Sequence, residues 1–193
     1  EGLRICAGRL ARYSGLRVRA VATEACRQAV NGQDFAARVK RETGISLEII
    51  NPEEEARLAL AGCASLLDDS APHAFVFDIG GGSTEIIWRR DARPGRGVNG
   101  HGFAADVLAY GLEAGERLRF HSVPIGVVTM AERYGADRVS PKAYEAMVEQ
   151  AVGLLRPFET AEQIGGEISS ARVQMLGTSG TVTTLARVFL NPR

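Results

Sequence analysis

Two kinds of hydrophobic pattern alternate along the chain: short apolar runs, and segments in which apolar residues recur every three or four positions. The first kind predicts strands and the second predicts helices. The predicted strands lie at 16–23, 46–50, 74–78, 86–88, 117–123 and 172–176, and the predicted helices at 3–13, 24–30, 34–42, 51–67, 127–134, 142–156 and 182–190. This alternation favours an α/β layer structure with mostly parallel strand pairing.

Breaks in these patterns predict how the chain is divided. The polar stretch at 69–72 is the predicted domain boundary, so that residues 1–71 and 72–193 would form two units. A segment rich in Gly and Arg at 91–103 predicts a mobile loop, and the pair Gly165-Gly166 predicts a break in the chain. The segment between 104 and 115 carries no clear pattern.

The helix that begins after Asn51 has the clearest start signals. Asn51 is a good N-cap, and Pro52 suits the first helical position. Glu54 completes an Asn-x-x-Glu pattern that resembles a capping box, and acids in a first turn complement the helix dipole. These roles account for Glu53 and Glu54 but not for Glu55. Glu55 is therefore a candidate functional residue, with an ordinary helical surface charge as the alternative.

The stretch HAFVFDIGGGSTEIIWR at 73–89 predicts a strand, a tight turn and a returning strand. Glycines at the turn can take positive φ and lack a Cβ, so the backbone can approach a ligand closely. Successive N–H groups there form an anion-binding concavity, and two hydroxyls add donors. Asp78 ends its strand where a carboxylate would meet a phosphate-bound metal ion. The candidate phosphate loop is Gly80, Gly81, Gly82, Ser83 and Thr84. The alternative is a loose hairpin turn capped by Asp78.

Two better-known phosphate loops are absent from the sequence. No GxxxxGK[ST] occurs, and no GxGxxG opens a helix. A second candidate ligand loop does precede a predicted helix, where backbone amides and hydroxyls suit an anion. It consists of Gly177, Thr178, Ser179, Gly180 and Thr181. Its alternative interpretation is a Ser/Thr-capped helix after a tight strand exit.

Composition narrows the class of protein. The chain has 23 basic and 23 acidic residues and no long basic run, so nothing favours binding of DNA or RNA. Three widely spaced cysteines indicate reduced thiols of a cytoplasmic protein, and three histidines lack metal-ligand spacing. No apolar run is long enough to cross a bilayer, so no membrane partner is expected.

Several motifs, in one order along the chain, resemble the exopolyphosphatase/guanosine pentaphosphate phosphatase (Ppx/GppA) family. They are ATEACRQAVNGQDF at 22–35, EIINPEEEARL at 48–58, VFDIGGGSTEI at 76–86, VPIGVVTMAE at 123–132 and LGTSGTVTTLA at 176–186. DIGGGSTE together with EEARL is the specific pairing. The resemblance implies a two-lobed, actin-like (ribonuclease H-like) α/β fold of the phosphotransferase type.

The resemblance also implies roles for individual residues. The glutamate before ARL is the family's catalytic base, which corresponds to Glu55. The DIGGGSTE loop binds phosphate and helps to hold magnesium or another divalent cation, with Asp78 and Glu85 as its acids. Arg27, in the RQAVN segment, is expected near the phosphate chain.

This chain departs from the family pattern in three places. A Ser-Ala-Xaa-Arg segment is usual where this chain has Glu24-Ala25-Cys26-Arg27, which changes the surroundings of Arg27. An early Asp-Xaa-Gly-Ser-Asn-Ser loop and a later Ser-Asp-Xaa-Gly-Leu-Arg-Glu-Gly segment do not occur in it. A chain trimmed at both ends would explain the two missing segments, and such a chain by itself is expected to show little or no hydrolysis.

The predicted function is a phosphohydrolase acting on inorganic polyphosphate. Guanosine pentaphosphate is the alternative substrate, and a non-catalytic nucleotide or alarmone sensor is an alternative from a different class. A homodimer is left open by the sequence.

Overall fold

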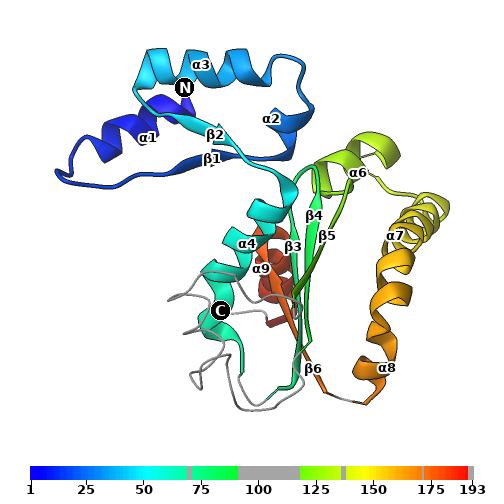
Figure 1. The fold of residues 1–193 in the computed structure, drawn as a ribbon. Coiled ribbons are helices and arrows are strands. Elements are labelled where there is room, and N and C mark those ends of the chain that lie inside the picture. The colour runs from blue at the N-terminus through cyan, green and yellow to red at the C-terminus, as the bar shows by residue number, and fades with distance from the viewer. Residues whose placement is uncertain (69–70, 91–117, 136–137, 171, 191–193) are drawn as a thin grey trace. The chain divides into compact units, whose positions relative to one another are not determined.

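The computed structural model describes residues 1–68, 71–90, 118–135, 138–170 and 172–190, which Figure 1 shows in colour. The chain divides into two compact units, Glu1–Glu55 and Ala56–Arg193. The predicted loop at 91–103 and the segment at 104–115 lie outside the described residues. Within the described residues, no helix is both long and apolar enough to span a lipid bilayer.

The first unit is a small α/β layer around two short strands. Its elements are α1 Gly2–Leu10, β1 Ala20–Ala22, α2 Glu24–Gln28, α3 Gly32–Thr43 and β2 Leu47–Ile49. β1 and β2 pair in parallel, as the strand–helix alternation predicts. Helix α3 buries Ala36 and Val39 and ends at Gly44, whose φ of 75° lies in the left-handed region that glycine adopts without strain.

Strand β1 is shorter than its apolar alternation predicts. The pattern extends over 16–23, but only three residues pair with β2, from Ala20 to Ala22. Leu16 and Val18 are 52% and 54% exposed, so the first half of the pattern is not buried against a neighbour. An apolar alternation forms a strand only where a partner strand continues alongside it.

The second unit contains a four-stranded sheet in the order β5-β4-β3-β6. Its strands are β3 His73–Ile79, β4 Thr84–Arg90, β5 Leu118–Val123 and β6 Val173–Thr178. The predicted hairpin is confirmed, since β3 and β4 pair antiparallel. β5 also joins β4 antiparallel, and β6 joins β3 in parallel. The expectation of mostly parallel pairing is therefore wrong for this sheet, because tight turns and meanders place successive strands antiparallel.

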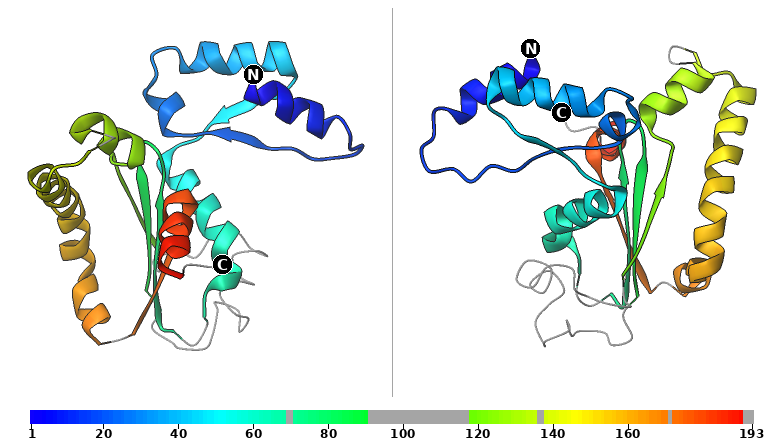
Figure 2. Two further views of the ribbon diagram at one scale, coloured as in Figure 1. Left: turned by 180° about the vertical axis from the view of Figure 1, so that it is seen from behind. Right: turned by 45° about the horizontal axis from the view of Figure 1, so that its top comes forward.

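One face of the sheet packs against α4 Pro52–Cys63, which continues into the short 3₁₀-helix η1 Ala64–Leu66. In Figures 1 and 2, α9 Ser179–Leu190 lies on the same face. The core of this face consists of Ala56, Leu60, Cys63, Ala64, Leu67, Ala74, Val76, Ile87 and Leu118. From Ala56 onward, α4 is thus part of the second unit. The predicted boundary at 69–72 comes later in the chain than the division after Glu55. A break in the sequence pattern marks a loop, whereas the unit to which a helix belongs depends on what the helix packs against.

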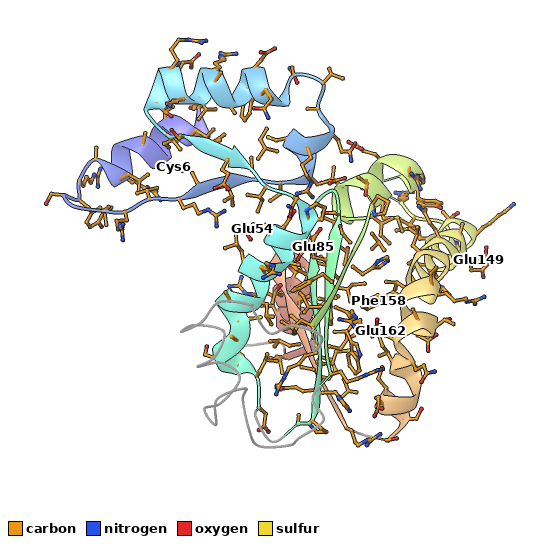
Figure 3. All side chains as sticks on the ribbon, viewed as in Figure 1. Cys6, Glu54, Glu85, Glu149, Phe158 and Glu162 are labelled. Atoms are coloured by element: carbon orange, nitrogen blue, oxygen red, sulfur yellow. The ribbon has the colours of Figure 1, made fainter. Side chains whose placement is uncertain are left out.

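The other face of the sheet carries α6 Val127–Tyr134 and α7 Pro141–Glu162, followed by α8 Ile164–Ser169 (Figures 1 and 2). Helix α7 continues past Pro157, beyond its predicted end at 156. The Phe158 ring stacks on His121 of β5 at a centroid distance of 5.0 Å, so the last turns of α7 contact the sheet. Figure 3 labels Phe158 and Glu162 on these turns. The break predicted at Gly165-Gly166 falls instead at Gln163, which has a φ of 53°, and both glycines lie within α8.

Candidate functional site: the glycine turn and the acids near it

The three glycines form the turn between β3 and β4, as predicted. The turn closes through a hydrogen bond from the Gly80 amide to the Ser83 carbonyl, at 3.0 Å. The expected positive φ is not found at Gly80 or Gly81. Glycine is favoured there by space, since a Cβ on Gly80 would come within 3.1 Å of the Ser83 carbonyl oxygen.

The N-terminus of α6 holds the carbonyl side of this turn. The Val127 amide donates to the Gly80 carbonyl at 3.0 Å, and the Val128 amide donates to the Gly81 carbonyl at 2.9 Å. Gly126 allows this approach, because a Cβ there would lie 2.5 Å from both carbonyl oxygens. The sequence motif around Pro124-Ile125-Gly126 therefore supports the turn, a role that the hydrophobic pattern alone did not predict.

This capping turns two amides of the loop outward. The described peptide bonds are trans, so the N–H that follows each carbonyl points in the opposite direction. The Gly80 and Gly81 carbonyls face α6, and the amides of Gly81 and Gly82 consequently point away from it. Neither amide donates a hydrogen bond within the described part of the chain. Two adjacent amides without partners form a concavity that suits an anion.

The two hydroxyls next to the glycines are less available than the sequence suggests. Thr84 Oγ1 donates to the Ile125 carbonyl at 2.7 Å, so its proton joins the hairpin to the segment before α6. Ser83 is only 2% exposed. The prediction that both hydroxyls add donors is therefore wrong for Thr84 in this structure, and the backbone amides provide the exposed donors.

The GTSGT segment lies beside the glycine turn. Gly177 and Thr178 end β6, and the next three residues form the first turn of α9. Ser179 has a φ of 85°, and its hydroxyl donates to the Ile79 carbonyl at 2.7 Å, just before the glycines. The two predicted loops line one hollow of about 650 Å³, formed by Ile79, Gly80, Gly81, Val127, Ser179, Gly180, Thr181, Thr184 and Leu185. The structure thus brings both candidate ligand loops together.

Two acids lie side by side at the same end of the sheet. Asp78 is paired in register with Glu85 on β4 and with Thr178 on β6. Asp78 is partly exposed, whereas Glu85 is 1% exposed and its Oε1 accepts a hydrogen bond from Ser122 at 3.0 Å. Figure 3 labels Glu85 on β4. Thr178 Oγ1 is buried without a hydrogen-bond partner among the described residues.

The carboxylate of Asp78 is close enough to Cys63 of α4 to affect the pKa of its thiol. Burial raises the pKa of the Cys63 thiol, and the negative charge of Asp78 adds to this rise. Side chains alternate along a strand, so Asp78 lies on the same face of β3 as Ala74 and Val76, the face that α4 covers. Within the described residues, no three His, Cys, Asp or Glu side chains gather into a metal site. A cation here would depend on Asp78, with Glu85 behind it, and on ligands from substrate and water.

In the first unit, Arg27 and Glu55 form an ion pair. Arg27 Nη1 lies 2.8 Å from Glu55 Oε2 and also donates to the Ile50 carbonyl at 2.8 Å. On its other edge, Nη2 and Nε donate to Glu24 Oε2 at 2.8 and 3.1 Å. Burial alone would lower the pKa of Arg27, but the hydrogen bonds to Glu55 and Glu24 outweigh it and raise the pKa. Glu24 was not among the predicted site residues.

The acids in the first turn of α4 have different hydrogen-bond partners. The Glu54 amide donates to Asn51 Oδ1 at 2.8 Å, which confirms the predicted N-cap. The Glu54 carboxylate accepts from Arg19 Nη1 at 2.8 Å, so it serves an ion pair and not the return half of a capping box. Glu55 is thus the acid of this turn that pairs with Arg27. Glu55 is the last residue of the first unit, whereas Asp78 belongs to the second unit.

The second unit is a mixed α/β domain in which a glycine turn, a helix N-terminus and an acid meet, as in phosphate-binding sites. Residues 1–190 match the Ppx/GppA phosphatase family, and the chain belongs to that family. The resemblance stated from the sequence motifs is therefore confirmed.

Relatives and solved structures agree with this assignment. A guanosine-5'-triphosphate,3'-diphosphate pyrophosphatase of Photobacterium profundum is 33% identical over 190 residues, 97% of this chain and 32% of that protein. An exopolyphosphatase structure from Cytophaga hutchinsonii has a TM-score of 0.73 at 25% identity and covers 97% of this chain and 51% of that one. A Ppx/GppA structure from Aquifex aeolicus has a TM-score of 0.61 at 29% identity, covering 98% and 51%.

These matches confirm the predicted α/β fold class. The chain spans about a third of the length of the Photobacterium relative and about half of the two solved chains.

Proposed function

We propose that the protein is a phosphohydrolase that releases the terminal phosphate of inorganic polyphosphate by attack of a water activated by Glu55. The observation that carries this proposal is the pair of outward-pointing amides at Gly81 and Gly82. Membership of a phosphatase family and the similarity to an exopolyphosphatase structure support it.

The glycine turn would hold the oxygens of the terminal phosphate. Backbone amides suit this task, because they carry partial positive charge and need no side-chain ordering on binding. The capping of the turn by α6 fixes the amides before a ligand arrives. In phosphoryl transfer, positioning and electrostatic stabilisation carry most of the catalysis. A rigid set of donors is what such a reaction needs.

Glu55 would accept a proton from the attacking water. Its carboxylate is held on one oxygen by Arg27, which leaves the other oxygen to receive the proton. Glu54 pairs with the exposed Arg19, whereas Glu55 pairs with the partly buried Arg27, so we assign the catalytic role in this turn to Glu55. A positioned general base contributes typically about 10²–10⁴-fold to the rate.

Magnesium fits the acids at the end of β3. Mg²⁺ usually takes one or two carboxylates and completes its shell with water and substrate phosphates. Asp78 is the partly exposed carboxylate there, and Glu85, buried and hydrogen-bonded to Ser122, would support it from the next strand. When bound, the ion would offset negative charge on the phosphates.

Replacing Asp78 with Asn should weaken binding of the divalent cation. The loss of a ligand should cost at least as much as the loss of an outer-shell partner, about 10–100-fold in metal affinity. Calorimetric titration of the full-length protein with Mg²⁺ or Mn²⁺ measures this effect. Asp34→Asn, an exposed acid on α3, is the matched control and should bind the ion as the wild type does. Unchanged affinity in Asp78→Asn would remove Asp78 from the site.

Guanosine pentaphosphate is the second candidate substrate. The 33% identical Photobacterium relative is named as a guanosine-5'-triphosphate,3'-diphosphate pyrophosphatase, and this similarity favours the second substrate. The same amides and the same base would serve either substrate, since both carry a terminal phosphoanhydride. The difference between the two lies in what binds the rest of the substrate.

A phosphate-release assay of the full-length protein on both substrates tests the proposed function. Release from polyphosphate supports the first proposal, and release from guanosine pentaphosphate alone supports the second. Binding of either compound without any release would replace both with a sensor role.

A further inference from the structure

We propose that Glu24 is a positioning residue that acts through Arg27 to orient the Glu55 carboxylate, and that Arg27 therefore serves the base more than it serves the phosphate. The inference rests on the proposed function of Glu55. It follows from how the Arg27 guanidinium is occupied within the first unit.

A guanidinium has five N–H donors. Arg27 makes four hydrogen bonds in the described structure: two to Glu24 Oε2, one to the Ile50 carbonyl and one to Glu55 Oε2. One N–H is left, so Arg27 cannot offer a phosphate the two parallel donors of a bidentate contact. The N–H groups of the Arg27 guanidinium point at the carboxylates of Glu24 and Glu55.

The three side chains share one partly buried cluster. Arg27, Glu24 and Glu55 are 14%, 16% and 17% exposed, so water screens their charges only in part. Two carboxylates around one guanidinium leave a local net charge of −1, which would repel a phosphate chain. The charge balance again favours a role for Arg27 in holding Glu55.

Glu24 fixes the edge of the guanidinium that Glu55 does not use. It is itself held by Gln28, whose Nε2 donates to Glu24 Oε1 at 3.1 Å on the same short helix. The Ile50 carbonyl fixes the plane of the guanidinium from a third direction. Removing Glu24 would free the Nε and Nη2 edge, loosen the guanidinium and release it toward substrate phosphate.

The test compares Glu24→Gln, Glu24→Asp and Glu55→Gln in the full-length protein, with kcat and KM measured on polyphosphate. Glu24→Gln should lower kcat roughly 10-fold, the scale of one weakened charge-assisted hydrogen bond. It should also lower KM, because the neutral amide holds the guanidinium edge less strongly and lets it turn toward phosphate. Glu24→Asp keeps the charge and should restore part of kcat. Calorimetry with inorganic tripolyphosphate should show tighter binding to Glu24→Gln.

Glu42→Gln is the matched control. Glu42 is shared by two arginines of the same unit, Arg38 and Arg4, both at 2.7 Å, and lies outside the cluster. It should lose stability without a change in kcat or KM. If Glu24→Gln behaves as Glu42→Gln does, Glu24 is merely structural and the inference is overturned. Wild-type turnover in Glu55→Gln would instead overturn the proposed function itself.

Discussion

Replacing Glu55 with Gln should reduce turnover of the full-length protein by roughly 10²–10⁴-fold, the contribution of a positioned general base. Gln has nearly the same shape, and its carbonyl oxygen can still accept from Arg27 Nη1, which now lies 2.8 Å from Glu55 Oε2. The fold should therefore remain, and only the proton acceptor is lost. Phosphate release, measured beside thermal unfolding, separates the two effects.

Glu54→Gln is the control for this experiment. It changes the neighbouring acid of the same helical turn and weakens the contact with Arg19, but leaves Arg27 untouched. Its turnover should stay within a few-fold of wild type. Wild-type turnover in Glu55→Gln would show that another group activates the water.

Replacing Gly126 with Ala should disable the glycine turn. A Cβ there would lie 2.5 Å from the Gly80 and Gly81 carbonyl oxygens, and backbone atoms cannot swing away as a flexible side chain does. Overpacking of this kind costs typically about 1–3 kcal/mol of folding stability. Displacing the turn would also misplace two amides, each worth roughly 1.5–3 kcal/mol to a charged ligand. Affinity for tripolyphosphate should fall roughly 100-fold or more.

Urea unfolding and calorimetric titration with tripolyphosphate measure the two effects separately. Gly153→Ala is the control, because a Cβ at Gly153 on α7 meets no atom within 4 Å. It should stabilise the helix by about 0.5–1 kcal/mol and leave the affinity unchanged. If Gly126→Ala binds tripolyphosphate as the wild type does, the turn is not the anion site.

Much of the local structure could be predicted from the sequence. The hairpin around the glycines, the N-cap at Asn51 and the range of α6 follow from hydrophobic period and cap chemistry. These features depend on residues within a few positions of one another, and such interactions are readable from spacing. The motifs were also sufficient to assign the family, since their order extends over most of the chain.

The hydrophobic pattern did not predict where α7 ends, a feature that involves contacts between residues distant in sequence. Helix α7 continues past Pro157, and Phe158 in its last turns stacks on His121, a residue more than thirty positions away. Gln163, and not the glycine pair after it, ends that helix. No local rule foresees either outcome, since tertiary packing overrides propensity.

The α/β fold class, the Ppx/GppA family and the glycine turn between two strands were all predictable from the sequence, and these predictions are confirmed. The role of Glu55 in catalysis stays a prediction. The contacts that these parts make depend on the tertiary structure. It set α6 against the turn so that two amides face outward, engaged the Thr84 hydroxyl, and surrounded Arg27 with two carboxylates. The reason is physical: hydrogen-bond direction and charge pairing depend on groups that are distant in sequence, and only folding brings them within reach.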